Sequence, residues 1–324
     1  MSPSAQILTT LRKSNHGVSG SDLCDMTGIS RAAIWAHIEN LRKAGFEIVA
    51  SPHRGYELVR CPEKLVSEDL ESRISKNQII GRRVHVLDST TSTNDEAEKF
   101  ASDQEPEGLV IFSESQTHGR GRMGRKWSSP GGKGLWFSIL LRPSLSANEC
   151  TQLTVASAVS LVHAINETSG ITPEIKWPND LLICGKKIAG ILTELHAELD
   201  CVRHLIIGVG INVNQTHSDF PAQITQIATS LKIASGAAVE RTVLAEEILK
   251  QMDKNYKRVL HGRFNELAQE WTNHCGTLGK DVDIQNGRNR VVGRAESLDE
   301  TGALLVRTQH GRIERIIGGD VTVV

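Results

Sequence analysis

The chain has 324 residues, of which 39% are hydrophobic, and its formal net charge is -1. This length predicts about two or three domains with ordinary hydrophobic cores. A net charge so close to zero excludes a polybasic nucleic-acid coat and an acidic tail protein. Any contact with DNA must therefore come from one local face.

The cysteine pattern and the N-terminal segment indicate a compartment. The six cysteines are scattered without a C-x-x-C pair. That spacing argues against a disulfide framework or a cysteine-based zinc site and is typical of a reducing cytosol. The segment MSPSAQILTTLRKSNHG lacks the apolar core and small-residue cleavage site of a secretory signal. No stretch approaches the ~18 apolar residues of a membrane helix. We therefore expect a soluble cytoplasmic protein that does not enter a membrane.

Residues 1–62 have the pattern of a winged helix-turn-helix. Apolar residues recur at helical spacing in residues 5–11. Ser21 is expected to cap a short second helix that Gly28 ends, and Ser30 is expected to cap a third. The residues that follow alternate in hydrophobicity around a Pro-to-Gly turn, as a β-hairpin does. Three helices and a β wing are the predicted elements.

Residues 63–274 mix strand and helix signals after a linker with a short helix, and predict a mixed α/β catalytic core. The expected strands are 84–87, 109–113, 135–141 and 205–213, and the expected helices are 94–102, 148–169 and 263–273. The apolar run GLWFSILLRP is expected to form either a buried strand or a strand at a dimer contact.

Residues 275–324 break into short strands with frequent glycines. This spacing predicts a small antiparallel barrel of the SH3 type. The fold class of the whole chain is therefore α+β, with a winged helix-turn-helix, a central α/β unit and a C-terminal barrel.

The segment GRGRMG at 119–124 matches G-x-G-x-x-G after an apolar strand. A dinucleotide fold would require a helix directly after the loop, but the chain continues as RKWSSPGGKG, which breaks helices. No P-loop motif occurs either. Glycines allow close backbone approach, and arginines bind phosphate or carboxylate oxygens in pairs. The loop is therefore either a lid that orders over an anionic ligand or a solvated basic surface loop.

Two further segments, KWPND at 176–180 and KKIAGIL at 186–192, carry lysines in specific settings. Pro178 cannot lie inside a helix or a central strand, so its neighbours are presented at a strand-to-loop edge. There they either orient a nucleotide or hold magnesium, or form an Asx turn with a surface lysine. Lys187 has apolar neighbours, whereas Lys186 is expected to face water. A lysine on an apolar strand is otherwise a snorkelling edge residue.

Five segments in this order resemble the biotin–protein ligase family over about the full length of the chain. They are STN at 92–94, GRGRMGRKW at 119–127, KWPND at 176–180, KKIAGIL at 186–192 and IIGVGINVN at 206–214. With the winged helix in front, the chain resembles the bifunctional bacterial type, which is both a biotin ligase and a repressor of the biotin operon.

The resemblance implies a reaction in two steps. The carboxylate of biotin attacks the α-phosphate of Mg²⁺-bound ATP and gives biotinyl-5'-AMP and pyrophosphate. A lysine of an acceptor, typically the biotin carboxyl carrier protein of acetyl-CoA carboxylase, then attacks the adenylate. Both nucleophiles belong to substrates, so the protein contributes positioning and charge neutralisation.

The resemblance also assigns residues to the site. On the biotin side it implies Ser92, Thr93, Asn94, Gln116, Gly119, Arg120, Gly121, Gly208 and Gly210. On the nucleotide side it implies Arg125, Trp127, Lys176, Asn179, Asp180 and Asn212. Arg122 and Lys187 are implied on both sides and as the catalytic groups, and Lys187 is the single strongest candidate.

Some positions depart from the family pattern or allow an alternative. Ser89 and Thr90 compete with Ser92 and Thr93, and the second pair is preferred because Asn94 completes the motif. Met123 stands where many relatives have another loop arginine. No tryptophan near 224–231 matches the one that stacks on adenine in some relatives. The C-terminal barrel is expected to have a supporting role.

The winged helix is expected to read DNA with the N-terminal part of its last helix. The implied residues are Ser30, Arg31, Ala32, Trp35 and His37 on that helix, and His53 and Arg54 on the wing. Ala36 replaces a lysine of the relatives. One such module binds weakly, so the chain is expected to bind biotin operator DNA as a homodimer when it holds the adenylate.

Other functions remain possible at this stage. The winged helix can instead serve protein contacts. The whole chain can be a non-catalytic biotin-sensing transcription factor, or a relative that handles lipoate or octanoate. The intact loop arginines and lysines argue against the former, and the winged helix argues against the latter.

Overall fold

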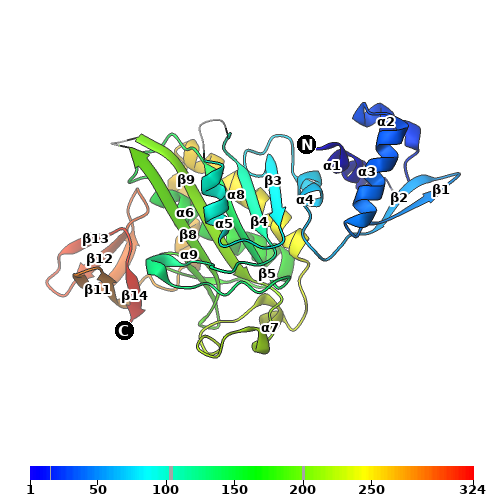
Figure 1. Ribbon diagram of the computed structural model, residues 1–324. Coiled ribbons are helices and arrows are strands. Elements are labelled where there is room, and N and C mark those ends of the chain that lie inside the picture. Colours follow the sequence, from blue (N-terminus) through cyan, green and yellow to red (C-terminus); the bar gives the residue numbers. More distant parts are fainter. Residues whose placement is uncertain (15, 102–104, 199–200) are drawn as a thin grey trace.

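A computed structural model describes residues 1–14, 16–101, 105–198 and 201–324. A small helical unit with a β-hairpin lies at one end of the molecule, a large sheet with helices in the middle, and a second sheet at the other end (Figure 1). The predicted α+β fold class and the order of its three units are confirmed. No helix in the described part of the chain is long and apolar enough to cross a membrane.

The N-terminal unit is a winged helix-turn-helix. Its elements are α1 (Pro3–Lys13), α2 (Gly20–Thr27), α3 (Arg31–Lys43), β1 (Glu47–Ser51) and β2 (Gly55–Arg60). Ser30 caps α3 as predicted, since its side chain accepts from the amide of Ala33. The predicted cap at Ser21 is wrong. Ser19 caps α2 by accepting from the amide of Asp22, and the helix therefore begins earlier, at Gly20.

A short helix, α4 (Ser67–Arg73), connects this unit to the large sheet, whose strand order is β3-β4-β5-β9-β8-β7-β6. The strands are β3 (Arg83–Leu87), β4 (Leu109–Ser113), β5 (Gly134–Leu141), β6 (Glu174–Lys176), β7 (Asp180–Ile183), β8 (Lys186–Glu198) and β9 (Cys201–Asn212). All eight residues of β5 are buried, and β5 pairs with β4 and β9 on its two sides. The run GLWFSILL is therefore a buried central strand, and it leaves no free edge for a dimer contact.

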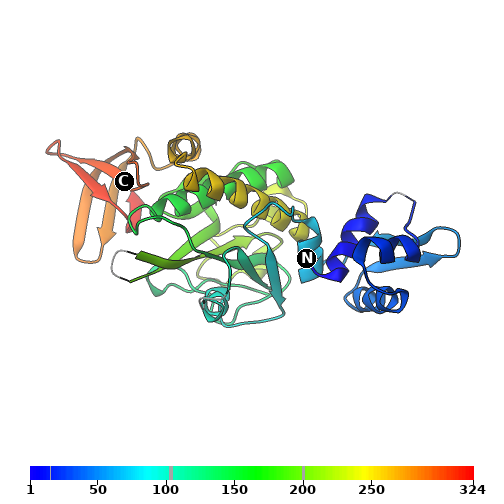
Figure 2. The same ribbon diagram turned by 90° about the horizontal axis from the view of Figure 1, so that it is seen from above.

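Helices cover the two faces of this sheet unequally (Figure 2). The long helices α6 (Thr151–Ser169), α8 (Arg241–Leu260) and α9 (Phe264–His274) pack on one face, and α5 (Thr93–Lys99) packs on the other. Helix α5 ends at Lys99 with Phe100 as its C-cap, so the helix is shorter than the predicted 94–102, whose last residue, Ser102, lies outside the described residues. Helix α8 and the short α7 (Leu231–Ser235) are elements that the sequence patterns did not separate.

Strand β9 shows how the sheet separates core from site. Ile207 and Ile211 belong to the main core with the long helices, whereas Ile206 packs with Ala97 of α5. Because side chains alternate between faces, Gly208 and Gly210 lie on the α5 face. That face is the one on which the cavity described below opens.

The C-terminal unit is an antiparallel sheet in the order β13-β12-β11-β10-β14. Its strands are β10 (Asp281–Asn286), β11 (Asn289–Leu298), β12 (Leu304–Thr308), β13 (Ile313–Ile316) and β14 (Asp320–Val323). Its buried residues, such as Val282 and Leu304, are continuous with the main core. The sheet is therefore seated firmly on the central unit, and β14 reaches the cavity.

Candidate active site

A cavity of about 650 Å³ opens on the α5 face of the large sheet. This volume is in the range of sites for small organic ligands. Of the ligand-binding residues predicted from the sequence, every one except Gly119 lines the cavity. Gly119 lies at the base of the loop, where an added Cβ would be 2.6 Å from the Trp127 carbonyl oxygen. Segments far apart in the sequence thus meet in one place.

One end of the cavity is a polar cradle built on the start of α5. Ser92, Thr93 and Asn94 are all buried there. The amide of Thr93 donates to Oε1 of Gln116 at 2.8 Å, and Nδ2 of Asn94 donates to Glu194 at 2.8 Å. These bonds fix the orientation of the donors and acceptors. Such a cradle suits a ligand with a compact polar ring.

The alternative pair, Ser89 and Thr90, does not line the cavity. Thr90 is buried and its hydroxyl donates to Glu96 at 2.7 Å instead. The pair completed by Asn94 is therefore the one that faces the ligand space.

Two glycines of β9 allow the cavity floor to come close. A Cβ on Gly208 would lie 2.2 Å from Oδ1 of Asn94, and a Cβ on Gly210 would lie 2.5 Å from the Trp127 indole. No side chain fits at either position without moving these neighbours. The sequence interpretation, a strand backbone passing close to the ligand, agrees with this packing.

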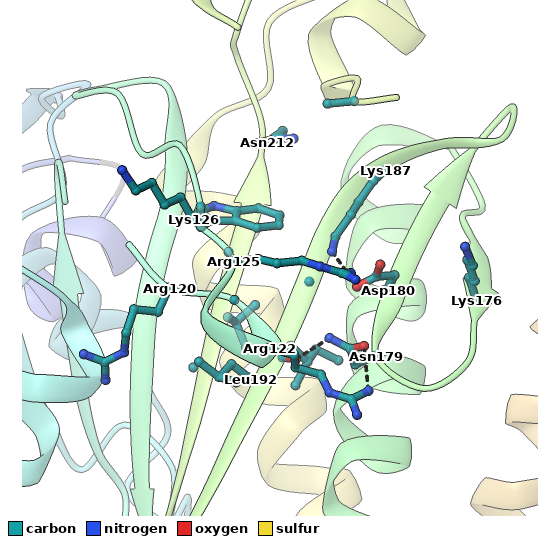
Figure 3. A pocket seen from close by; sticks show the side chains of 18 of the residues that line it. Arg120, Arg122, Arg125, Lys126, Lys176, Asn179, Asp180, Lys187, Leu192 and Asn212 are labelled. Carbon is teal, nitrogen blue, oxygen red and sulfur yellow. Dashed lines mark hydrogen bonds and ion pairs between the residues drawn. The ribbon is translucent and has the colours of Figure 1, made fainter. Parts of the chain in front are cut away.

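The glycine–arginine loop is folded back on itself. The amide of Trp127 donates to the Gly119 carbonyl at 2.8 Å, and the amide of Gly121 donates to the Arg125 carbonyl at 2.7 Å. Met123 at the tip has a φ of 55° and is exposed. The loop therefore presents its arginines in different directions, although they are close in sequence (Figure 3).

Arg120 points to the cradle end. It pairs with Asp95 of α5 at 2.5 Å and with Glu194 of β8 at 3.4 Å. The hydrogen bond to Asp95 is the main cause that raises the pKa of the Arg120 guanidinium. This arginine is therefore held by two protein carboxylates.

Arg122 lies on the opposite side, where its Nη1 donates to Oδ1 of Asn179 at 3.3 Å (Figure 3). Burial lowers the pKa of the Arg122 guanidinium, while Asp180 and Asp320 oppose this shift. A partly desolvated guanidinium of this kind gains strongly from an incoming anion.

Lys187 projects from β8 into the middle of the cavity. Its Nζ lies 2.6 Å from Oδ1 of Asp180 and 5.2 Å from the centroid of the Trp127 ring. Figure 3 shows Lys187 and Arg125 both directed toward Asp180. The indole of Trp127 in turn packs edge-on against Trp136, with centroids 6.3 Å apart. The predicted apolar setting of Lys187 is thus an aromatic wall.

The cavity lining is strongly cationic. Its basic side chains are Arg120, Arg122, Arg125, Lys126, Lys176 and Lys187, and its carboxylates are Asp180 and Asp320. This excess of positive charge in a concave site attracts polyanions such as a nucleoside triphosphate.

Several lining residues were not predicted from the sequence. They include Lys126, Phe220, Ile224, Ile227, Ala228 and residues 319–322 at the start of β14. Phe220, Ile224, Ile227 and Ala228 are apolar residues in a loop without helical or strand periodicity, and this was the only sequence feature that could have indicated their place in the cavity. The C-terminal sheet does more than support the fold, because Asp320 pairs with Arg125 and Gly318 packs on Arg122.

Asn212 lines the cavity, but its amide is largely used by the protein. Its Nδ2 donates to the Thr229 carbonyl at 3.0 Å, and its Oδ1 accepts from Gln215 at 3.0 Å. Asn212 is thereby bonded to the end of the segment 220–229, whose apolar residues line the cavity.

The predicted DNA-reading residues lie at the far end of the molecule. Ser30, Arg31, Ala32 and Trp35 are exposed on α3, and His53 and Arg54 are exposed in the turn of the wing. His37 is only half-exposed, and its Nδ1 lies 2.9 Å from Oγ of Ser4 on α1. One ring nitrogen of His37 is therefore occupied within the domain.

Comparison with known proteins places the chain in a family. Residues 86–212 match the biotin/lipoate A/B protein ligase family, residues 4–57 match an HTH domain, and residues 277–324 match the biotin protein ligase C-terminal domain. The chain belongs to the biotin protein ligase family.

Its relatives narrow this class to the type with a DNA-binding domain. The chain is 40% identical to the bifunctional ligase/repressor BirA of Bacillus spizizenii, over 94% of this chain and 93% of that protein. It is 39% identical to the protein of the same name from Bacillus subtilis, over 95% and 94%. A structure of biotin protein ligase from Aquifex aeolicus in complex with biotin and ATP matches with a TM-score of 0.64 and 31% identity, over 75% of this chain and 99% of that one.

Proposed function

We propose that the protein is an ATP-dependent biotin–protein ligase, a biotin–[acetyl-CoA-carboxylase] ligase, and also a biotin-responsive transcriptional repressor. It forms biotinyl-5'-AMP and pyrophosphate, and then transfers biotin to a lysine of a biotin carboxyl carrier protein. One observation carries the ligase half: a single cavity joins a preorganised polar cradle to a cationic cluster around Lys187. Acyl adenylation requires that combination.

The polar cradle is the proposed site for the biotin ring. Ser92, Thr93 and Asn94 with Gln116 offer fixed donors and acceptors to the ureido group, and Gly208 lets the ring lie against β9. The carboxylate end then points along the cavity toward Lys187. Trp127 forms the wall beside the reacting atoms.

Lys187 and Arg122 are the proposed catalytic residues. The ammonium of Lys187 moves from Asp180 to the carboxylate and α-phosphate oxygens, where negative charge accumulates as the new bond forms. Arg122 neutralises a second phosphate oxygen. One well-placed cationic or hydrogen-bonding group of this kind contributes about 3 kcal/mol to the barrier. Neither residue forms a covalent bond to the substrate.

Arg125, Lys176, Asn179, Asp180 and Asn212 are proposed to line the nucleotide side. Mg²⁺ fits this region as the companion of the ATP phosphates, whose charge it neutralises when bound. The available carboxylates, Asp180 and Asp320, are each paired with a cation, so the protein offers at most one or two ligands. Sharing between phosphates and few protein oxygens is the usual mode for Mg²⁺.

The repressor half rests on the exposed α3 and wing. Arg31 with its exposed neighbours is proposed to contact the major groove of operator DNA, and Arg54 the adjacent backbone. The adenylate orders the glycine–arginine loop and favours a homodimer, which doubles the DNA contacts. The two proposed partners, a carrier protein and operator DNA, support a cytoplasmic location.

Biotin-dependent exchange of pyrophosphate into ATP tests the ligase proposal, with lipoate as the control acid. Exchange with biotin alone is the expected result. Exchange with neither acid would contradict the proposed ligase activity. Exchange with lipoate would indicate a relative that handles lipoate or octanoate. Sedimentation with and without biotinyl-5'-AMP tests the dimer, and an unchanged monomer–dimer equilibrium would refute it.

A further inference from the structure

A second cluster of ligand-type side chains lies outside the cavity. It consists of Glu98 on α5, His196 on β8 and His204 on β9. One oxygen or nitrogen from each of these side chains lies within 4.8 Å of those of the other two. None of the three lines the cavity. The cluster is therefore spatially separate from the cavity.

The sheet itself brings the two histidines together. His196 and His204 are directly opposite each other in the β8–β9 register, and their rings stack with centroids 4.4 Å apart at 14°. A bulge follows His196 at once. Because opposite residues share a face of the sheet, both imidazoles project toward α5.

Glu98 meets both rings at the same atom. Its Oε2 lies 2.9 Å from Nε2 of His204 and 3.2 Å from Nε2 of His196. Both imidazoles thus direct the same nitrogen at one point in space. A hydrogen bond between Glu98 and His204 would need only one imidazole. The approach of the second imidazole, that of His196, to the same oxygen is not explained by that hydrogen bond.

From this convergence we infer that Glu98, His196 and His204 form a binding site for a divalent transition-metal ion such as Zn²⁺. Imidazole nitrogens and a carboxylate oxygen are the donor set that such ions select. Two ligands at about 2.1 Å from one ion can be at most about 4.2 Å apart. Oε2 of Glu98 lies within this limit of both imidazole nitrogens, at 2.9 Å and 3.2 Å.

The three side chains differ in exposure, so the proposed site is buried on one side and open to solvent on the other. His204 is 7% exposed, whereas Glu98 and His196 are exposed. The ion enters from solvent and displaces the two imidazole–carboxylate contacts. Water completes the coordination, as at zinc sites with three protein ligands.

The bound ion connects α5 to the β8–β9 hairpin. Glu98 lies one helical turn after Asn94, so both are on the same face of α5. Asn94 contacts Glu194, which lies two residues before His196 on β8. The ion therefore fixes the same helix and strand that carry the polar cradle.

The test is equilibrium dialysis of the full-length protein against Zn²⁺, with bound zinc measured by mass spectrometry. We expect one more bound equivalent in the unchanged protein than in the His196→Asn/His204→Asn variant. The matched control is His163→Asn/His274→Asn. That pair also has a nearby glutamate, but its rings are 6.1 Å apart and almost perpendicular. The control should bind as much zinc as the unchanged protein.

Equal zinc in the unchanged protein and the His196/His204 variant would overturn the site. If that variant does not fold, Glu98→Gln replaces it, because the amide keeps the shape and removes the anionic ligand. Its affinity for Zn²⁺ should fall by about tenfold or more, a loss usual even for outer partners of a metal. Zinc should also raise the melting temperature of the unchanged protein more than that of Glu98→Gln, and an equal rise in both would refute the site.

Discussion

Replacement of Lys187 by alanine should stop adenylate formation without unfolding the protein. The two effects differ because the ammonium contributes little to stability and much to the transition state. Its ion pair with Asp180 has 33% and 24% exposed side chains. A pair screened to this extent contributes about 1 kcal/mol or less to folding. The stacking on Trp127, at 5.2 Å, adds about 0.5–1 kcal/mol.

The catalytic loss is larger. During attack on the α-phosphate, negative charge grows within reach of Lys187, and one preorganised donor at such a place is worth about 2.7–4 kcal/mol. We therefore expect biotin-dependent pyrophosphate exchange to fall by about 100- to 1,000-fold. The melting temperature should fall by only a few degrees.

Lys186→Ala is the matched control, since Lys186 precedes Lys187 on β8 and does not line the cavity. Its exchange rate should stay within about twofold of the unchanged protein. A near-normal rate for Lys187→Ala would refute the reasoning. An equal loss in both variants would also refute it, because it would trace the effect to the strand and not to the ammonium.

Three further outcomes follow from the geometry. Arg122→Gly should release biotinyl-5'-AMP, which would be detected as biotin on lysines of bystander proteins. Retention of the adenylate would indicate that another arginine of the loop holds it. Gly208→Ala should raise the KM for biotin by about tenfold or more, because its Cβ would lie 2.2 Å from Oδ1 of Asn94, and an unchanged KM would contradict the cradle. Burial raises the pKa of the Cys150 thiol to about 11. Because the thiolate is the form that reacts, iodoacetamide at pH 8 should label the exposed Cys184 and leave Cys150 unmodified. Labelling of both cysteines at an equal rate would contradict the burial of Cys150.

The sequence predicted the local elements well where period and caps agree. The buried strand at Gly134–Leu141 and the cap at Ser30 are examples. At Ser19 and Ser21 two serines can both cap, and only the packing of α2 decides between them. The family resemblance of five ordered motifs predicted most of the residues that line the cavity. The close packing at the β9 glycines gives a physical reason for one of these motifs.

Sequence patterns do not reveal what the tertiary fold alone brings together. Glu98 and His204 are far apart in the chain and share no motif, so the cluster with His196 appears only when α5 packs on the hairpin. The contribution of Asp320 to the cavity was missed for the same reason. It lies in a domain whose strands carry no signal of a ligand.

The connection between the DNA-binding and catalytic halves is a buried ionic contact and not a loose linker. Asp69 of α4 is fully buried and pairs with Arg12 of α1 and Arg73 of α4. Arg73 also pairs with Glu246 of α8 at 2.7 Å. A buried carboxylate that loses a partner costs about 3–5 kcal/mol, so the winged helix cannot leave α4 without exposing or neutralising Asp69. The DNA-reading helix is therefore held at a fixed position relative to the central sheet. In the proposed homodimer, the way in which the two central units associate would therefore also set the spacing of the two α3 helices.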